Sequence, residues 1–87
     1  MKMKYHFETI IVDDAIRMIP VGGEVFNGVL TVNETMKDIM DLLAEERTES
    51  EVVSAMLERY EDVTREEMTT AVRHVCASLR EEGLLAE

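Results

Sequence analysis

Cysteine, proline and tryptophan are rare or missing in this sequence. Its 87 residues contain one cysteine, one proline and no tryptophan, with only two phenylalanines and two tyrosines. The single thiol, Cys76, excludes an internal disulfide and is compatible with a reducing cytoplasm, which we expect for this protein. With so few rings, the core must be aliphatic, supplemented by methionine. The length predicts one domain over residues 1–87.

Basic residues are also scarce. Nine Lys and Arg stand against 19 Asp and Glu, which gives a formal net charge of −10. Such a field repels phosphate backbones and anionic membrane surfaces, so neither nucleic acid nor membrane is an expected partner. The acid excess by itself indicates solubility more than a specific cationic ligand. No apolar run approaches the roughly 20 residues of a membrane span.

Recognisable catalytic motifs are missing too. His74 and Cys76 are two residues apart on a predicted helix, so they point roughly 200° apart and cannot bind one metal ion. Gly22-Gly23 lacks the spacing of a phosphate-binding loop. Paired acids arise by chance in so acidic a chain. We therefore predict no catalytic residue, no metal site, no cofactor and no enzymatic activity.

Strand signals are confined to the first third of the chain. Residues 4–12 are rich in β-branched and aromatic types, and residues 15–19 alternate apolar and polar side chains. Asp13-Asp14 is a turn signal between them. Residues 29–32 predict a third strand. Short connections favour an antiparallel meander in which the second strand is central and the third is an edge.

Helix signals fill the rest of the chain. Asn33 is a candidate N-cap for a helix over residues 34–43, although Thr31 with Glu34 forms a rival capping box. Further capping boxes, Thr48 to Glu51 and Thr64 to Glu67, predict the starts of two more helices. Met68, Val72, Val75 and Leu79 form the expected apolar stripe of the third helix. Gly83 predicts its end, with Leu84 folding back in a Schellman-type cap.

Three strands followed by three helices predict an α+β domain. The second and third helices resemble a helix-turn-helix, which leaves a DNA-binding or transcriptional module as an alternative. However, the basic residues of the third helix are offset by Glu66, Glu67, Glu81 and Glu82, which is unlike a DNA-reading helix.

Two features suggest a binding surface. The predicted edge strand carries no Lys, Pro or charge that would discourage pairing with another strand. On one flank of the third helix, the side chains nearest the core are small and those farther out are basic. This pattern suits an extended peptide with an acidic residue, although the solvent-facing side of an ordinary helix gives the same pattern. The candidate peptide-binding residues are Val29, Leu30, Thr31, Val32, Thr69, Val72, Arg73, Cys76 and Arg80. Edge pairing between two copies, giving a homodimeric scaffold, is a further alternative.

Several segments together resemble the PqqD-like family of RiPP recognition elements over residues 5–86. These segments are Val32-Asn33-Glu34-Thr35, Glu46-Arg47-Thr48-Glu49, Val52-Val53, Tyr60, and Leu79 through Leu85. The resemblance implies a winged-helix-like domain of three strands and three helices. It also implies a non-catalytic peptide chaperone that binds the leader of a ribosomally made precursor peptide. In the family, the leader joins the third strand, lies against the third helix, and is presented to a modifying enzyme, often a radical S-adenosylmethionine enzyme.

Three positions depart from the usual family pattern. Met36 stands where a small residue is common in the family, and Met40 where Trp is frequent. Ala71 precedes Val72 where members that serve pyrroloquinoline quinone synthesis tend to carry an Asp-Val pair. These departures favour a PqqD-like protein of another peptide pathway over one that serves pyrroloquinoline quinone synthesis.

Overall fold

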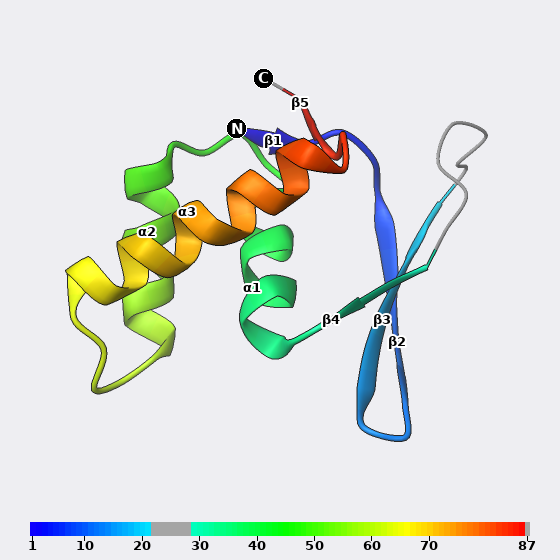
Figure 1. Ribbon diagram of the computed structural model, residues 1–87, viewed down its shortest axis with the longest axis horizontal. Helices are drawn as coiled ribbons and strands as arrows, with labels where there is room; N and C mark the ends of the chain where they lie inside the picture. Colours follow the sequence, from blue (N-terminus) through cyan, green and yellow to red (C-terminus); the bar gives the residue numbers. More distant parts are fainter. Residues whose placement is uncertain (22–28, 87) are drawn as a thin grey trace.

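The computed structural model describes residues 1–21 and 29–86, and within them a small sheet stands beside three helices (Figure 1). The elements are β1 (Lys2–Met3), β2 (Phe7–Val12), β3 (Ala15–Pro20), β4 (Leu30–Val32), α1 (Glu34–Leu42), α2 (Glu49–Arg59), α3 (Arg65–Glu81) and β5 (Leu85–Ala86). The predicted α+β order of three antiparallel strands and then three helices is confirmed. Gly22-Gly23 lies outside the described residues.

The sheet has the order β2-β3-β4, with β3 in the centre and both neighbours antiparallel to it. Asp13 and Asp14 connect β2 to β3, and both adopt positive φ angles, 50° and 64°. That left-handed pair matches the right-handed twist of a tight hairpin, and Asp tolerates it better than most residues. The strand predicted over residues 4–12 is β2, and it begins at Phe7, three residues later than predicted.

Strand β4 leads directly into α1, and Asn33 marks the joint. Its side-chain oxygen accepts a hydrogen bond from the backbone N–H of Met36 at 2.8 Å. This bond satisfies one of the first-turn donors that have no partner within the helix. The N-cap at Asn33 is therefore confirmed, in place of the rival box at Thr31. The direct joint fixes where β4 lies relative to the helices.

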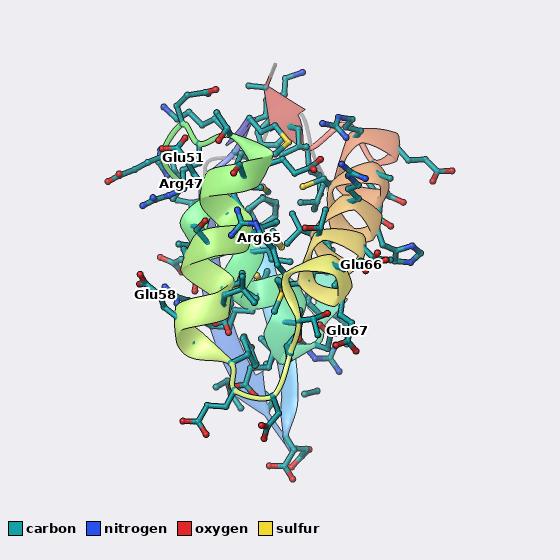
Figure 2. All side chains as sticks on the ribbon, turned by 90° about the vertical axis from the view of Figure 1, so that its left-hand side faces the viewer. Arg47, Glu51, Glu58, Arg65, Glu66 and Glu67 are labelled. Carbon is teal, nitrogen blue, oxygen red and sulfur yellow. The ribbon has the colours of Figure 1, made fainter. Side chains whose placement is uncertain are left out.

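Both remaining helices begin at the predicted capping boxes. The Thr48 hydroxyl accepts from the Glu51 amide, and the Glu51 carboxylate accepts from the Thr48 amide. Thr64 and Glu67 make the same reciprocal pair. Figure 2 shows these two glutamates at the starts of α2 and α3.

The predicted end of α3 is also confirmed. Gly83 has φ of 73°, and its amide donates to the Arg80 carbonyl at 3.0 Å. The amide of Leu84 donates to the Leu79 carbonyl at 2.9 Å, which completes a Schellman motif. The Leu84 side chain is fully buried, so this cap also closes the hydrophobic core.

The core is aliphatic and sulfur-rich, as the composition predicts, and joins the sheet to all three helices. Its fully buried side chains come mostly from the helices: Ile39, Leu43, Val52, Val53, Met56, Val72, Cys76, Leu79 and Leu84. Met18 of β3 and Val32 of β4 are the sheet's buried contributions. The β2–β3 hairpin extends away from the helices (Figure 1), so its tip adds nothing to this core.

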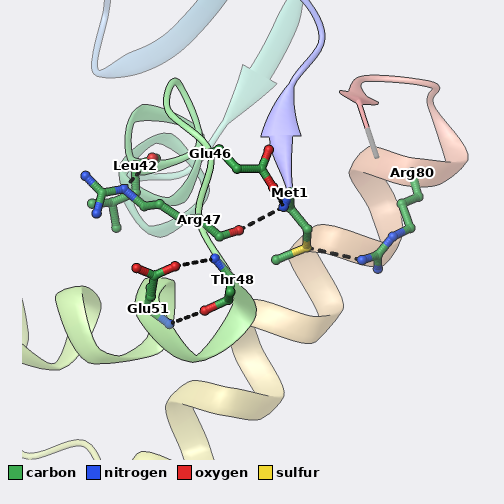
Figure 3. Close-up of polar contacts among 7 residues, drawn as sticks. All are labelled: Met1, Leu42, Glu46, Arg47, Thr48, Glu51 and Arg80. Atoms are coloured by element: carbon green, nitrogen blue, oxygen red, sulfur yellow. Dashed lines mark hydrogen bonds and ion pairs between the residues drawn. The ribbon is translucent and has the colours of Figure 1, made fainter.

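A second, two-stranded ribbon joins the N-terminal segment to the segment after α3, and the sequence did not predict it. Lys2 pairs with Ala86, and Met3 with Leu85. The Met3 amide also donates to the Leu43 carbonyl at 2.7 Å. The Met1 amino group contacts the Glu46 carboxylate and the Arg47 carbonyl (Figure 3). The first residues are thereby packed against the end of α1.

Candidate functional site

The edge of the sheet at β4 is the first part of the candidate site. Pairing with β3 occupies one side of β4, and no other strand among residues 1–21 and 29–86 pairs with it. Val32 is 8% exposed and Leu30 half-buried, whereas Thr31 is exposed. Leu30 and Val32 therefore pack toward the helices, and Thr31 points away from them. Val29, just before the strand, is 51% exposed.

The second part is α3, where the structure corrects one sequence interpretation. Cys76 is 1% exposed and belongs to the core with Val72, so it does not lie on an accessible flank. Val75, which the sequence placed in the buried stripe, is only half-buried. The reason is that Cys76 is four residues beyond Val72 and therefore lies about 40° from it around the helix, while Val75 lies about 60° away on the other side.

Three of the nine predicted contact residues are thus buried. Val32, Val72 and Cys76 belong to one hydrophobic cluster, so β4 and α3 share the same core. These three can support a bound peptide from below the surface but offer almost no area to it. The accessible candidates are Val29, Leu30 and Thr31 on the strand side, and Thr69, Arg73 and Arg80 on α3.

The accessible side chains of α3 already have partners within the chain. The Arg73 Nε donates to the Glu49 Oε1 at 2.8 Å, an exposed ion pair between α3 and α2. Arg80 Nη2 lies 3.2 Å from the Met1 Sδ (Figure 3). The Thr69 hydroxyl donates to the Arg65 carbonyl at 2.8 Å. An incoming carboxylate would therefore have to compete with Glu49 for Arg73.

The sheet has a second open edge, at β2, which the sequence did not indicate as a binding surface. Its residues after Phe7 are all exposed, including Ile10, Ile11 and Val12, and Ile11 is 67% exposed. The signal was present as a run of four β-branched residues, Thr9 to Val12. Because only a strand on one side and no helix covers β2, periodicity alone could not show that both of its faces are open.

Among the described residues, side-chain pKa values are shifted at the helix caps and where two side chains share a hydrogen bond. The Thr48 amide and hydroxyl hold the pKa of Glu51 below its ordinary value, and Thr64 does the same for Glu67. The hydrogen bond to Asp38 raises the pKa of Tyr60. These shifts have structural causes and indicate no acid–base catalyst.

Metal-binding clusters and membrane-spanning helices are both absent from the described residues. The described residues contain no group of three His, Cys, Asp or Glu side chains that could hold a metal ion. Among the helices that the structure describes, none is long and apolar enough to span a membrane.

Comparison with known proteins identifies the family. The sequence matches the family described as coenzyme PQQ synthesis protein D (PqqD) over residues 8–85, which is nearly the whole chain. The chain belongs to the PqqD family. No protein with a curated description matches it.

One solved structure with a similar fold is described as TbiB1 in complex with the TbiA(beta) leader peptide. It matches this PqqD-family chain with a TM-score of 0.70 and 20% identity, covering 100% of both chains. The match therefore includes the β1–β5 ribbon as well as the sheet and helices. At this identity the likeness concerns the fold, and the functional inference has to rest on the site.

Proposed function

We propose that this PqqD-family protein is a non-catalytic chaperone that binds the leader segment of a ribosomally made precursor peptide. The observation that carries the proposal is the edge of β4, which is uncharged, unpaired on one side within the described chain, and anchored to the core by Val32. Membership of the PqqD family supports it. So does the full-length fold match to TbiB1, whose structure contains a leader peptide.

The binding mode is strand addition. A peptide laid along β4 in extended conformation pairs its amides and carbonyls with those that β4 directs outward. Selectivity then comes from side chains, because the backbone groups are the same for every sequence. We assign that role to the exposed Val29 and Thr31 and to the accessible α3 residues Thr69, Arg73 and Arg80.

The second partner is a modifying enzyme to which the bound leader is presented. The family resemblance implies an enzyme of the radical S-adenosylmethionine type in many cases. The chaperone itself supplies no chemistry in this proposal. We also expect a cytoplasmic setting, since precursor peptides are made there and the single cysteine forms no disulfide.

Proline substitution tests strand addition directly. Proline lacks the N–H donor, and its ring intrudes on an incoming strand. We expect Thr31→Pro or Val29→Pro to weaken leader binding at least tenfold, about 1.4 kcal/mol. The measurement is calorimetric titration with synthetic leader peptides from precursor genes beside this one.

Circular dichroism melts provide the folding control for those variants. Met18→Pro, on the central strand β3, is the matched comparison, and it should damage the fold far more than either edge variant. Edge variants that remain folded and bind as tightly as the parent would show that the peptide does not pair with β4. Absence of binding by the parent protein at high micromolar concentration, for every neighbouring precursor, would contradict the chaperone function itself.

A further inference from the structure

A cavity of about 320 Å³ lies between the N-terminal segment, β3 and the C-terminal end of α1. Its apolar lining includes Met3, Met18 and Met40, and its polar lining includes Lys2 and Lys4. No residue of β4, α2 or α3 lines it. The cavity therefore shares no lining residue with the surface to which we assign the leader peptide, although Met18 pairs with Leu30 across the sheet.

The charge around this cavity is opposite to that of the whole chain. The protein has a net charge of −10 and three lysines, two of which line the cavity. Lys2 and Lys4 are exposed, and neither forms an ion pair with any residue that the structure describes. Asp41 is the acid in the lining, and its carboxylate is bound to Lys37 at 2.6 Å.

The backbone holds the two lysines in place. The β1–β5 ribbon pairs Lys2 with Ala86, and the Lys4 amide donates to the Leu84 carbonyl at 2.8 Å. Alternation along this extended segment buries Met3 and leaves both lysines exposed. The cationic rim is therefore part of the fold rather than a loose terminus.

The negative end of the α1 dipole, which would repel an anion here, is partly neutralised. The Leu42 carbonyl accepts a hydrogen bond from the Arg47 Nε at 2.8 Å, as Figure 3 shows. The Leu43 carbonyl accepts from the Met3 amide. Beside these occupied carbonyls stand two ammonium groups that have no carboxylate partner among the described residues, and the Lys4 ammonium lies 5.9 Å from the centre of the Tyr5 ring.

We propose that this cavity receives an acidic segment of the modifying enzyme, with an apolar side chain against the methionines and carboxylates beside Lys2 and Lys4. Methionine side chains adapt to anchors of different shape, and exposed ammonium groups attract carboxylates. The inference rests on the proposed function, because presentation requires the leader and the enzyme to bind at the same time. A leader along β4 leaves this cavity open.

The chemistry of the cavity is tested with a defined probe, the peptide acetyl-Glu-Leu-Glu-Phe-Glu-amide, titrated into isotopically labelled protein. We expect chemical-shift changes at the methyl groups of Met3, Met18 and Met40, and none with an analogue that has Lys in place of each Glu. Equal responses to both peptides, or shifts confined to β4 and α3, would overturn the proposal.

The identity of the occupant is tested with the doubly substituted variant Lys2→Glu/Lys4→Glu. Its affinity for the modifying enzyme encoded beside the gene should fall at least tenfold, while leader affinity stays within twofold of the parent. The control is Arg59→Glu/Arg65→Glu, which changes net charge equally at the α2–α3 turn, at the opposite end of α3 from β1 and β5 (Figure 1). The control should bind both partners normally.

Failure of this inference is distinguishable from failure of the proposed function. If Lys2→Glu/Lys4→Glu binds the enzyme as tightly as the parent does, or loses the leader instead, the assignment of the cavity to the enzyme is wrong. If the parent protein binds no leader at all, the chaperone function fails, whatever the cavity binds. Thr31→Pro provides the reciprocal variant, losing leader affinity while retaining the enzyme.

Discussion

Cys76 shows how burial determines the reactivity of one side chain. It is 1% exposed and lies in the hydrophobic cluster with Val72. A thiol reagent can reach it only after local or global opening of the fold. We expect a chromogenic disulfide reagent to modify the native protein at least about a hundredfold more slowly than the protein in guanidinium. Equal rates would place Cys76 on an accessible face of α3.

The contribution of charge to leader binding can be tested at Arg73. Arg73→Glu removes the ion pair with Glu49 and adds repulsion toward an acidic leader. Exposed pairs contribute roughly 0.2–1 kcal/mol, so we expect about a two- to fivefold loss of leader affinity at low salt. The loss should shrink as salt screens it. The measurement is calorimetry at two ionic strengths. Arg80→Glu is a second variant that should also weaken leader binding.

Glu49→Gln is the informative counterpart of that variant, because it frees Arg73 without reversing any charge on α3. It should leave binding of an acidic leader unchanged or make it tighter. Weaker binding with Glu49→Gln would mean that the ion pair itself is needed to shape the surface, and that Arg73 does not contact the peptide.

The sequence could predict which residues of α3 are apolar but not the exact rotation of the helix. Met68, Val72 and Leu79 are common to the predicted and observed stripes. Val75 and Cys76 both satisfy helical spacing with them, and hydropathy favours neither decisively. The helix packs against α1, α2 and β5, and the side of α3 that such tertiary packing buries is not encoded in the helix's own periodicity.

The helix caps are elements whose stability depends on pH. In the folded state the pKa values of Glu51 and Glu67 are held below the ordinary value of 4.5. A lowered folded-state pKa gives stability that is present above the ordinary pKa and lost as pH falls through the lowered one. We therefore expect the melting temperature to decrease below about pH 4.5, in part because the two boxes open.

Charge-neutral variants isolate that contribution. Glu51→Gln/Glu67→Gln keeps the hydrogen-bond acceptors but removes the titration, so its melting temperature should depend less steeply on acid than that of the parent. Glu58→Gln/Glu66→Gln removes the same charge from the same helices but leaves both capping carboxylates in place (Figure 2). The capping interpretation fails if both double variants respond to acid alike.

Among the secondary-structure elements, the sequence correctly predicted the helix ends that are fixed by interactions between residues close in the chain. Asn33, Thr48, Thr64 and Gly83 each act within a few residues, and all four cap as expected. The β1–β5 ribbon escaped prediction because two-residue strands carry no periodicity and their partners are more than 80 residues apart. The cavity between that ribbon and α1 was hidden for the same reason.

For the whole molecule, the net charge of −10 separates the proposed function from the helix-turn-helix alternative. Phosphate contacts depend on basic side chains, and their effect is greatest at low salt. We expect no change in fluorescence anisotropy when labelled mixed-sequence duplex DNA is titrated with the protein at low ionic strength. Salt-sensitive binding in that assay would revive the DNA-binding alternative.

The shortness of β4 limits how much of a peptide's affinity the backbone can provide. The strand has three residues, and alternate residues direct their N–H and C=O groups to opposite sides. An added strand thus gains roughly two to four backbone bonds, each contributing about 0.5–1.5 kcal/mol net. A micromolar complex requires about 8 kcal/mol beyond the entropy lost on association. Backbone pairing therefore fixes the alignment of any bound peptide, while side-chain contacts decide which peptide is retained, so unrelated leaders should dock in one register with affinities that differ by orders of magnitude.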